Sequence, residues 1–525
     1  MARGTAERPR EPGQGRNSDP LPPGAGPAAF GNRQAACGAT IRHSETDGAV
    51  RGSLPQSRWG EGEVVTGIGL QPQEPAKRGG YFPHFSAFLR SAVRSSGPWL
   101  TTTAALAALG MYAPLALQAG APWLLLGTII HAYAFSLILA GAWQNPLVRF
   151  IADKLSEGHP EEILPGIRTA GVGVFGLSLA VVGPATCFAR FDAPVHDPLL
   201  FRLATVLLFA ILGELWIGMS CLGSSRTRLL VFLPFLAGSA ISLVLSILAI
   251  RRGLVSSALL GYVAGQALSV ALLSYLGERE FRGRGWWHRG SLARLQRYAP
   301  LALAGFFYNA GIWADKIILW ITRGTSQGAN LLHPYPPYDI PALLAFLSLV
   351  PALIWGLSAG EANFLRPYRA FAESLLHEPL VQIQRTGREL REAVRRALSG
   401  MAMFQGIFTL ACLILAGPLL RAIGFGWVSP RLFRILLLAA FASALLMNTL
   451  VLMLYLELCR EAARSALWFL AANVTLTLIS TRWGEAALGW GYLIAAVLTL
   501  AYAWLVLVAR LPKLDYYLFT RQIEV

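Results

Sequence analysis

The 525-residue sequence has few acidic residues and no paired cysteines. It holds 29 Asp and Glu against 45 Lys and Arg, and charged residues make up 14% of the chain. Its cysteines form no CxxC pair and have no metal-ligand spacing. Four of them lie within or at the ends of apolar runs, where cysteine behaves as a small hydrophobic residue. We therefore expect no disulfide, zinc or redox site at the five positions, which are Cys37, Cys187, Cys221, Cys412 and Cys459.

Two enzyme signatures are also missing. The sequence contains no GxxxxGK[ST] phosphate loop and no HExxH, so it has no ATP-binding or metalloprotease motif of these kinds. His131 is isolated within an apolar run, and a hydrogen bond at a helix interface explains it better than a role as a membrane acyltransferase base. A membrane-embedded transferase would also need a convergent acid and base at one membrane face. We expect no enzyme, no cofactor and no metal.

Long apolar runs dominate what the sequence does contain. The chain is 54% apolar, with a mean hydropathy of +0.49. Each run is long enough to cross a hydrocarbon core of about 30 Å at a rise of 1.5 Å per residue. We therefore predict an all-α polytopic membrane protein with 12 transmembrane helices in two six-helix lobes. The predicted spans are residues 97–118, 122–145, 170–188, 198–222, 229–250, 254–276, 299–322, 340–358, 399–420, 432–458, 465–481 and 486–508.

The basic residues between these spans are segregated by side. If the amino terminus is cytoplasmic, the cytoplasmic segments hold 27 Lys and Arg from Lys77 onward, and the opposite segments hold 7. This is the positive-inside pattern, and an even number of spans then leaves both termini cytoplasmic. The formal charge of +16 does not indicate a nucleic acid partner, because the basic residues lie in short loops between apolar helices.

The spans divide into two groups of six. Residues 1–80 are rich in Gly, Pro, Arg and Ser, which predicts a disordered tail, with a translation start near Val64 or Val65 as an open alternative. We expect an N-lobe over 81–276, which begins with a short amphipathic surface helix at 82–93. A basic cytoplasmic linker at 277–298 then leads to a C-lobe over 299–525.

The seventh span carries the most polar residues. On a helix, Tyr308 and Asp315 share one face, while Asn309, Trp313 and Lys316 share another. Asp315 and Lys316 point about 100° apart, so we expect neither to be the other's best partner. Aromatic rings and an amide beside a carboxylate are typical of a sugar-binding path. The alternative is an interhelical ion pair with interfacial tryptophans.

Glu214, beside Trp216 in the fourth span, is a second carboxylate within the membrane. A charged group at mid-membrane costs roughly 2.5–3.5 kcal/mol on insertion scales, so such groups usually face a partner or a wet cavity. Glu214 is predicted to lie towards the cytoplasm and Asp315 towards the outside, which places them at two depths of one pathway. The substrate-path candidates are Glu214, Tyr308, Asn309, Trp313, Asp315 and Lys316.

Residues 360–398 form a basic cytoplasmic loop. Pro379 breaks it, and the following segment has an amphipathic helical pattern with an apolar stripe at Ile383, Leu390 and Val394. Such a helix could lie on anionic lipid or dock a cytoplasmic partner. The partner-docking candidates are Arg385, Arg388, Arg391 and Arg395.

Several segments resemble the PelG family of bacterial exopolysaccharide systems, within the multidrug/oligosaccharidyl-lipid/polysaccharide flippase superfamily. The most specific is Gly305–Lys316 in span seven. The resemblance covers 67–525 and departs at 71–87, where a Pro- and Gly-rich run stands. The other segments that carry it are Gly67–Leu70, Ser95–Trp99, Arg149–Lys154, Tyr338–Pro341, and Glu361 with Tyr368 and Phe371.

The resemblance implies export of a Pel-type amino-sugar polymer across the bacterial inner membrane. It also implies partners, namely a cytoplasmic glycosyltransferase and membrane scaffold subunits. Because that polymer is partly deacetylated and cationic, Glu214 and Asp315 would be suitable contacts. Two alternatives stay open: an ion-coupled flippase of lipid-linked oligosaccharide or drugs, and a scaffold subunit of the synthase complex.

Overall fold

A computed structural model describes residues 81–514, apart from 192–194, 223–230, 282, 284, 288–297, 326–328 and 356–360. The predicted tail at 1–80 lies outside the described residues, as does most of the predicted linker at 277–298. The described part of the chain is helical, and its β-structure is limited to an isolated bridge between Phe191 and Ala329. The all-α prediction is confirmed.

The described helices fall into two halves along the chain. The first six are α1 (Tyr81–Ala116), α2 (Ala121–Ser156), α3 (Ile163–Cys187), α4 (Pro198–Leu222), α5 (Phe232–Ile250) and α6 (Val255–Glu280). The second half comprises α8 (Ala299–Thr322), α9 (Pro336–Leu347), α10 (Val350–Trp355), α11 (Glu361–His377), α12 (Leu380–Ile414), α13 (Ala416–Ala422), α14 (Pro430–Tyr455), α15 (Cys459–Arg482) and α16 (Trp490–Arg510).

Membrane-spanning character extends through both halves. Within the described residues, 11 helical segments are long and apolar enough to cross a bilayer, and each overlaps a predicted span. The remaining predicted span is α8, whose 24 residues give sufficient length. Its polar residues Asn309, Asp315 and Lys316 keep its hydropathy below that of the others. The chain is therefore a multi-pass membrane protein, and the predicted span that carries the predicted site lacks a stretch as apolar as those of the other spans.

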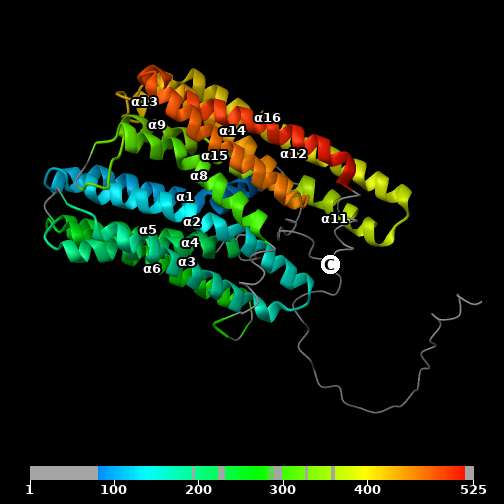
Figure 1. Cartoon of the computed structure of the whole chain (residues 1–525), viewed down its shortest axis with the longest axis horizontal. Coiled ribbons are helices and arrows are strands. Elements are labelled where there is room, and N and C mark those ends of the chain that lie inside the picture. Colours follow the sequence, from blue (N-terminus) through cyan, green and yellow to red (C-terminus); the bar gives the residue numbers. More distant parts are fainter. Residues whose placement is uncertain are drawn as a thin grey trace, which may run out of the picture. The chain divides into compact units, whose positions relative to one another are not determined.

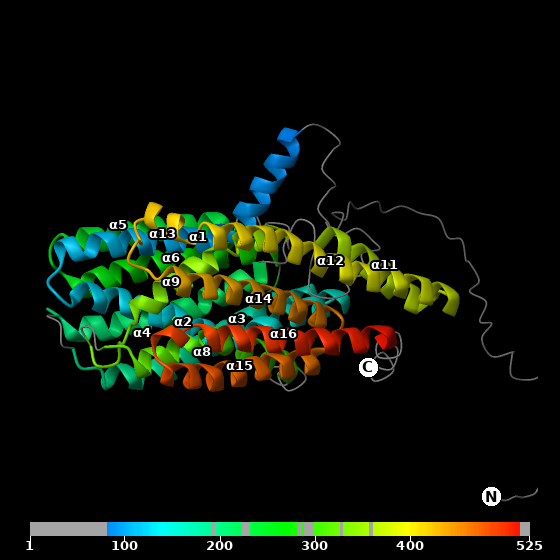
Figure 2. The ribbon, with the colours of Figure 1, turned by 90° about the horizontal axis from the view of Figure 1, so that it is seen from above.

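The entry segment differs from the prediction. We expected a separate surface helix at 82–93, but α1 runs without interruption from Tyr81 through the first span. Figure 2 shows the first turns of α1 leaving the bundle at an angle. Pro98 lies within this helix, and Gly97 packs so closely on α5 that an added Cβ would lie 2.5 Å from the Phe232 ring.

Most helix contacts stay within one half of the chain. Helices α2, α4, α5 and α6 pack on one another, and α14, α15 and α16 form a second group with α8 and α9 (Figure 1). Contacts of α2 with α8 and of α1 with α10 join the halves. At the α2–α8 crossing the backbones touch, since a Cβ on Gly305 would lie 2.1 Å from the carbonyl oxygen of Gly141. Small residues permit such close approach of membrane helices.

Hydrogen bonds and ion pairs at the helix ends agree with the predicted alternation of sides. Arg168, at the start of the third span, pairs with Glu278 at the end of the sixth, 2.7 Å away. Arg251, at the opposite end, donates to the hydroxyl of Tyr112 at 3.2 Å. Each contact joins two ends that the spans assign to the same side. Which side is cytoplasmic remains a prediction from charge.

The basic segment of α12 does not lie free. Helices α11 and α12 pack on each other and extend beyond the bundle at one end (Figures 1 and 2). The break at Pro379 is confirmed, because α11 ends at His377 and α12 begins at Leu380. The predicted apolar residues Leu390 and Val394 are each 1% exposed and belong to the same buried cluster as Phe371 of α11. The apolar stripe therefore covers α11, which leaves the arginine face outward.

Candidate functional site

The polar residues of α8 meet at Asp315 and Lys316. Lys316 Nζ lies 3.2 Å from Asp315 Oδ1 and 3.3 Å from Oδ2. We expected neither residue to be the other's best partner; the two do form an ion pair, although the shortest hydrogen bond of Asp315 is made with Tyr338. Their backbone positions diverge, but the four-carbon lysine stem is long enough to bring the ammonium back to the carboxylate. It also donates to the Ile312 carbonyl at 3.1 Å, one helical turn earlier.

A second helix completes the surroundings of the carboxylate. Tyr338, from α9, donates its hydroxyl hydrogen to Asp315 Oδ2 at 2.6 Å. Both side chains are 1% exposed. The Lys316 ammonium also lies 5.1 Å from the ring centre of Phe346 and 5.3 Å from that of Tyr492. These rings come from α9 and α16, so the buried pair connects three helices.

Asp315 and Lys316 therefore form a buried ion pair whose two charges compensate each other. Burying two charges costs several kcal/mol per ion unless geometry and hydrogen bonds offset the loss of water. Here the carboxylate receives two donors, and the ammonium has a carboxylate, a carbonyl and aromatic faces. Asp315 is thus sealed in this structure, and it can meet a substrate only after the surrounding helices rearrange.

The other α8 candidates face different neighbours. Trp313 is half-buried, and its ring centre lies 5.7 Å from Lys316 Nζ, so it belongs to the same group. Tyr308 packs on Phe469 of α15, with ring centres 6.0 Å apart. Asn309 lies against α2, where a Cβ on Gly141 would meet its amide nitrogen at 2.3 Å. The structure therefore brings Trp313, Asp315 and Lys316 together, and Asn309 borders the crossing between the two halves.

Glu214 belongs to another place in the fold. It lies on α4 facing α3, where a Cβ on Gly171 would come within 2.7 Å of its carboxylate. It is half-buried, and no ion pair joins it to any residue that the structure describes. Its neighbour Trp216 donates its indole hydrogen to Ser136 of α2 at 3.1 Å. Glu214 therefore has no basic partner among the described residues.

Sequence reasoning missed one ionisable residue of this region. Asp339 of α9 accepts the indole hydrogen of Trp320 at 2.9 Å and the Tyr335 backbone N–H at 3.0 Å. Trp320 stacks in turn on His131 of α2, with ring centres 4.2 Å apart. The predicted span began at 340 and so excluded Asp339, whereas α9 begins at Pro336. The sequence signal for the earlier start was a proline, which is favoured at the first position of a helix.

His131 illustrates how α2 is tied to α8. Its Nδ1 lies 2.8 Å from the carbonyl oxygen of Gly127, one turn earlier in α2. Its hydrogen bond therefore stays within its own helix, and its contact across the interface is the aromatic stack on Trp320. Among the described residues, no group of three or more His, Cys, Asp and Glu side chains is placed to hold a metal ion.

The arginines of α12 form a separate charged surface. Arg385, Arg388 and Arg395 are exposed, whereas Arg391 is half-buried. Arg385 is partly compensated, since its Nε lies 3.4 Å from Glu389 one turn later. The structure thus places three of the four predicted docking arginines on an open face at the end of the bundle.

Solved transporter structures share this fold at low sequence identity. A MATE transporter in complex with MaL6 aligns at a TM-score of 0.59 and 14% identity, over 82% of this chain and 97% of that one. A MOP superfamily transporter from Pyrococcus furiosus aligns at 0.54 and 13%, over 82% and 96%. An outward-facing multidrug resistance MATE transporter of the MOP superfamily aligns at 0.53 and 14%, over 84% and 98%.

The sequence comparison is more specific. No curated protein matches the chain at a significant level. The PelG family, described as exopolysaccharide exporters (EPS-E), matches residues 65–519 and thus nearly the whole described region. This match agrees with the transporter fold and with the helices that span the membrane. The chain is therefore a polytopic membrane transporter that belongs to the PelG family.

Proposed function

We propose that this protein exports a Pel-type amino-sugar exopolysaccharide across the bacterial inner membrane, with both termini cytoplasmic. The observation that carries the proposal is the family match over residues 65–519 on a transporter fold. Elongation by a cytoplasmic glycosyltransferase would deliver the polymer, and membrane scaffold subunits would hold the two proteins together. The positive-inside charge pattern supports the orientation.

The chemistry of the candidate residues supports a cationic sugar as cargo. Glu214 is a half-buried carboxylate with no ion pair to a described residue, and Trp313 offers a half-buried aromatic face. A carboxylate attracts an ammonium group, and an aromatic ring packs on the apolar face of a sugar or attracts a cation. Asp315 is buried against Lys316 and Tyr338, so we propose that it becomes available when the two halves separate.

Secretion of polymer by membrane-inserted variants tests the proposal. We expect Glu214→Gln and the double variant Asp315→Asn/Lys316→Met, which removes both charges of the buried pair together, to reduce secreted polymer severalfold while their amounts in the inner membrane stay at the wild-type level. Glu485→Gln, which neutralises an exposed carboxylate in the short 3-10 helix between α15 and α16, is the matched control and should secrete normally. Normal secretion by both test variants would remove these residues from the path and favour the scaffold alternative.

Glu214 also favours a second candidate, an ion-coupled flippase of lipid-linked oligosaccharide or drugs. An unpaired carboxylate within a span can bind and release a proton or a sodium ion as it changes access between the two sides. Reconstituted vesicles distinguish the two functions. Flipping driven by an ion gradient without a glycosyltransferase would support the second candidate, and transport that requires the active synthase would support export.

A further inference from the structure

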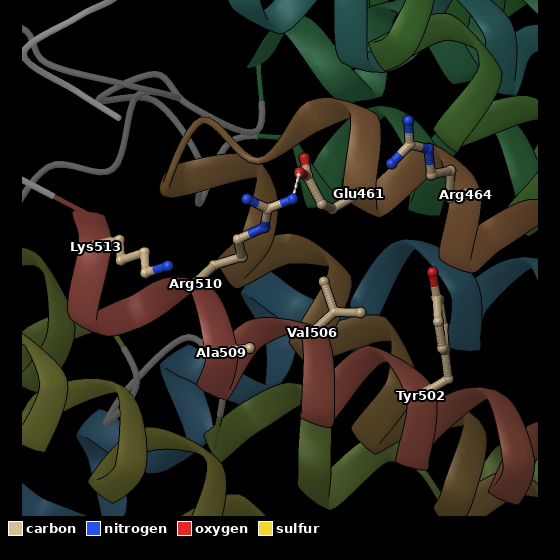
Figure 3. Close-up of a pocket in the computed structure, with 7 residues that line it drawn as sticks. All are labelled: Glu461, Arg464, Tyr502, Val506, Ala509, Arg510 and Lys513. Atoms are coloured by element: carbon tan, nitrogen blue, oxygen red, sulfur yellow. Dashed lines mark ion pairs between the residues drawn. The ribbon is translucent and has the colours of Figure 1, made fainter. Parts of the chain in front are cut away.

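A pocket of about 350 Å³ lies between the start of α15 and the end of α16 (Figure 3). Three cationic side chains line it, namely Arg464 from α15, Arg510 from α16 and Lys513 from the turn that follows. Glu461 and Tyr502 contribute the acidic and phenolic groups of the lining. None of these residues belongs to the α8–α9 site, so the pocket needs an explanation of its own.

The pocket carries an excess of positive charge. Arg510 reaches across to Glu461, with 3.2 Å between its guanidinium and the carboxylate, so these two charges compensate each other (Figure 3). Arg464 and Lys513 are exposed, and neither forms an ion pair with a residue in the described part of the chain. Two positive charges therefore remain beside a fixed guanidinium, in a hollow large enough for a phosphate ester.

The surroundings place this pocket at the level of lipid headgroups. Trp468 and Leu505, on the same two helices, are 60% and 66% exposed, so the wall next to the pocket is apolar and faces outward. The rings of Trp468 and Tyr502 lie 6.5 Å apart. Basic residues and aromatic rings at the ends of membrane helices mark the interface between hydrocarbon and water. An occupant can therefore place charge in the pocket and hydrocarbon along the helices.

We infer that this pocket binds the phosphate-bearing headgroup of an anionic phospholipid, whose acyl chains lie along α15 and α16. Arginine and lysine donors are suited to phosphate oxygens, and Glu461 holds Arg510 in position to serve as one of them. A lipid with two phosphates, such as cardiolipin, matches the two uncompensated charges. This site is independent of the polymer path and of the proposed function.

Native mass spectrometry of the detergent-purified protein tests the inference. The protein is titrated with cardiolipin, with zwitterionic phosphatidylethanolamine and with inorganic phosphate. The test variant is Arg464→Gln/Lys513→Gln, because both side chains are exposed and their loss leaves the Arg510–Glu461 pair intact. The control variant is Arg431→Gln/Arg482→Gln, which removes the same charge from exposed positions at the other ends of α14 and α15.

We expect the wild type and the control variant to bind cardiolipin in preference to phosphatidylethanolamine. The test variant should bind cardiolipin roughly thirtyfold more weakly, since each interfacial cation contributes about 1 kcal/mol. Unchanged size-exclusion elution shows that the variants are folded. Wild-type affinity in the test variant, or equal weakening in the control, would overturn the site. Displacement of cardiolipin by millimolar phosphate would show a general anion site instead of a lipid site.

Discussion

Arg149 at the end of α2 forms an ion pair with Glu457, which follows α14 and lies 308 residues further along the chain. Arg149 Nε also lies 2.8 Å from Asp153, and Tyr298 donates to the same carboxylate at 2.5 Å. Glu457 adopts a left-handed backbone with φ of 61°, which is costly for a residue with a side chain. Its surroundings thus hold it in place, and the pair joins the two halves of the transporter at one end.

Loss of this pair should loosen that end. Cys221 of α4 is 2% exposed and lies in the buried cluster that both halves share there. We expect Glu457→Gln to destabilise the closed arrangement by roughly 1–2 kcal/mol, since the pair is only partly exposed. Maleimide labelling of Cys221 should then become about tenfold faster for each 1.4 kcal/mol by which the closed arrangement is destabilised. Labelling of the exposed Cys187, at the opposite end of the bundle, should not change. Equal Cys221 labelling rates in wild type and variant would show that the pair does not hold this end closed.

The crossing of α2 and α8 gives a second prediction. Gly305→Ala would place a methyl group 2.1 Å from the Gly141 carbonyl oxygen, so the helices must separate. We expect a loss of roughly 1–3 kcal/mol, which is the usual cost of overpacking, and a lower melting temperature in detergent. Gly176→Ala is the matched control, because nothing lies within 4 Å of the added Cβ and alanine favours a helix. Equal melting temperatures for the two variants would contradict the close crossing.

Sequence patterns were sufficient for the arrangement along the chain. Apolar length located the spans, and the alternation of successive spans grouped helix ends that meet, such as Arg168 with Glu278. These properties depend on composition averaged over many residues. Composition indicates which segments lie within the hydrocarbon layer, because the bilayer sorts residues by polarity.

Contacts between particular side chains could not be predicted in the same way. The bond from Tyr338 to Asp315 depends on how α8 and α9 are rotated against each other, which no single-helix pattern specifies. The pairing of Asp315 with Lys316 depends on side-chain torsions, which the directions of the Cβ atoms alone do not specify. Candidate residues within a span can therefore be recognised from the sequence, because an ionisable group in the membrane is costly. Their partners can be identified only from the structure in which the helices are packed.

The buried pair of α8 allows a test in which a double variant is more stable than a single one. Lys316→Met leaves the Asp315 carboxylate buried with Tyr338 as its remaining donor, which should cost roughly 3–5 kcal/mol. Asp315→Asn/Lys316→Met removes both charges and should recover most of that stability. Thermal unfolding in detergent measures both. If the double variant is less stable than Lys316→Met alone, the two charges do not compensate each other.

The arginine face of α12 leads to the last prediction. Arg385 and Arg388 are exposed on a helix whose apolar side is already covered by α11, so their charge faces outward at the end of the bundle. A glycosyltransferase with an acidic surface would complement it. Arg385→Gln/Arg388→Gln should lower co-purification of that enzyme severalfold, most clearly at low salt, where exposed charges are least screened.

Leu390 and the α11 contacts are untouched, so the helix pair should stay folded. Arg431→Gln/Arg482→Gln removes equal charge elsewhere and should co-purify normally. Equal co-purification by both variants would assign the α12 face to lipid, and vesicles with and without anionic lipid would then detect its binding directly.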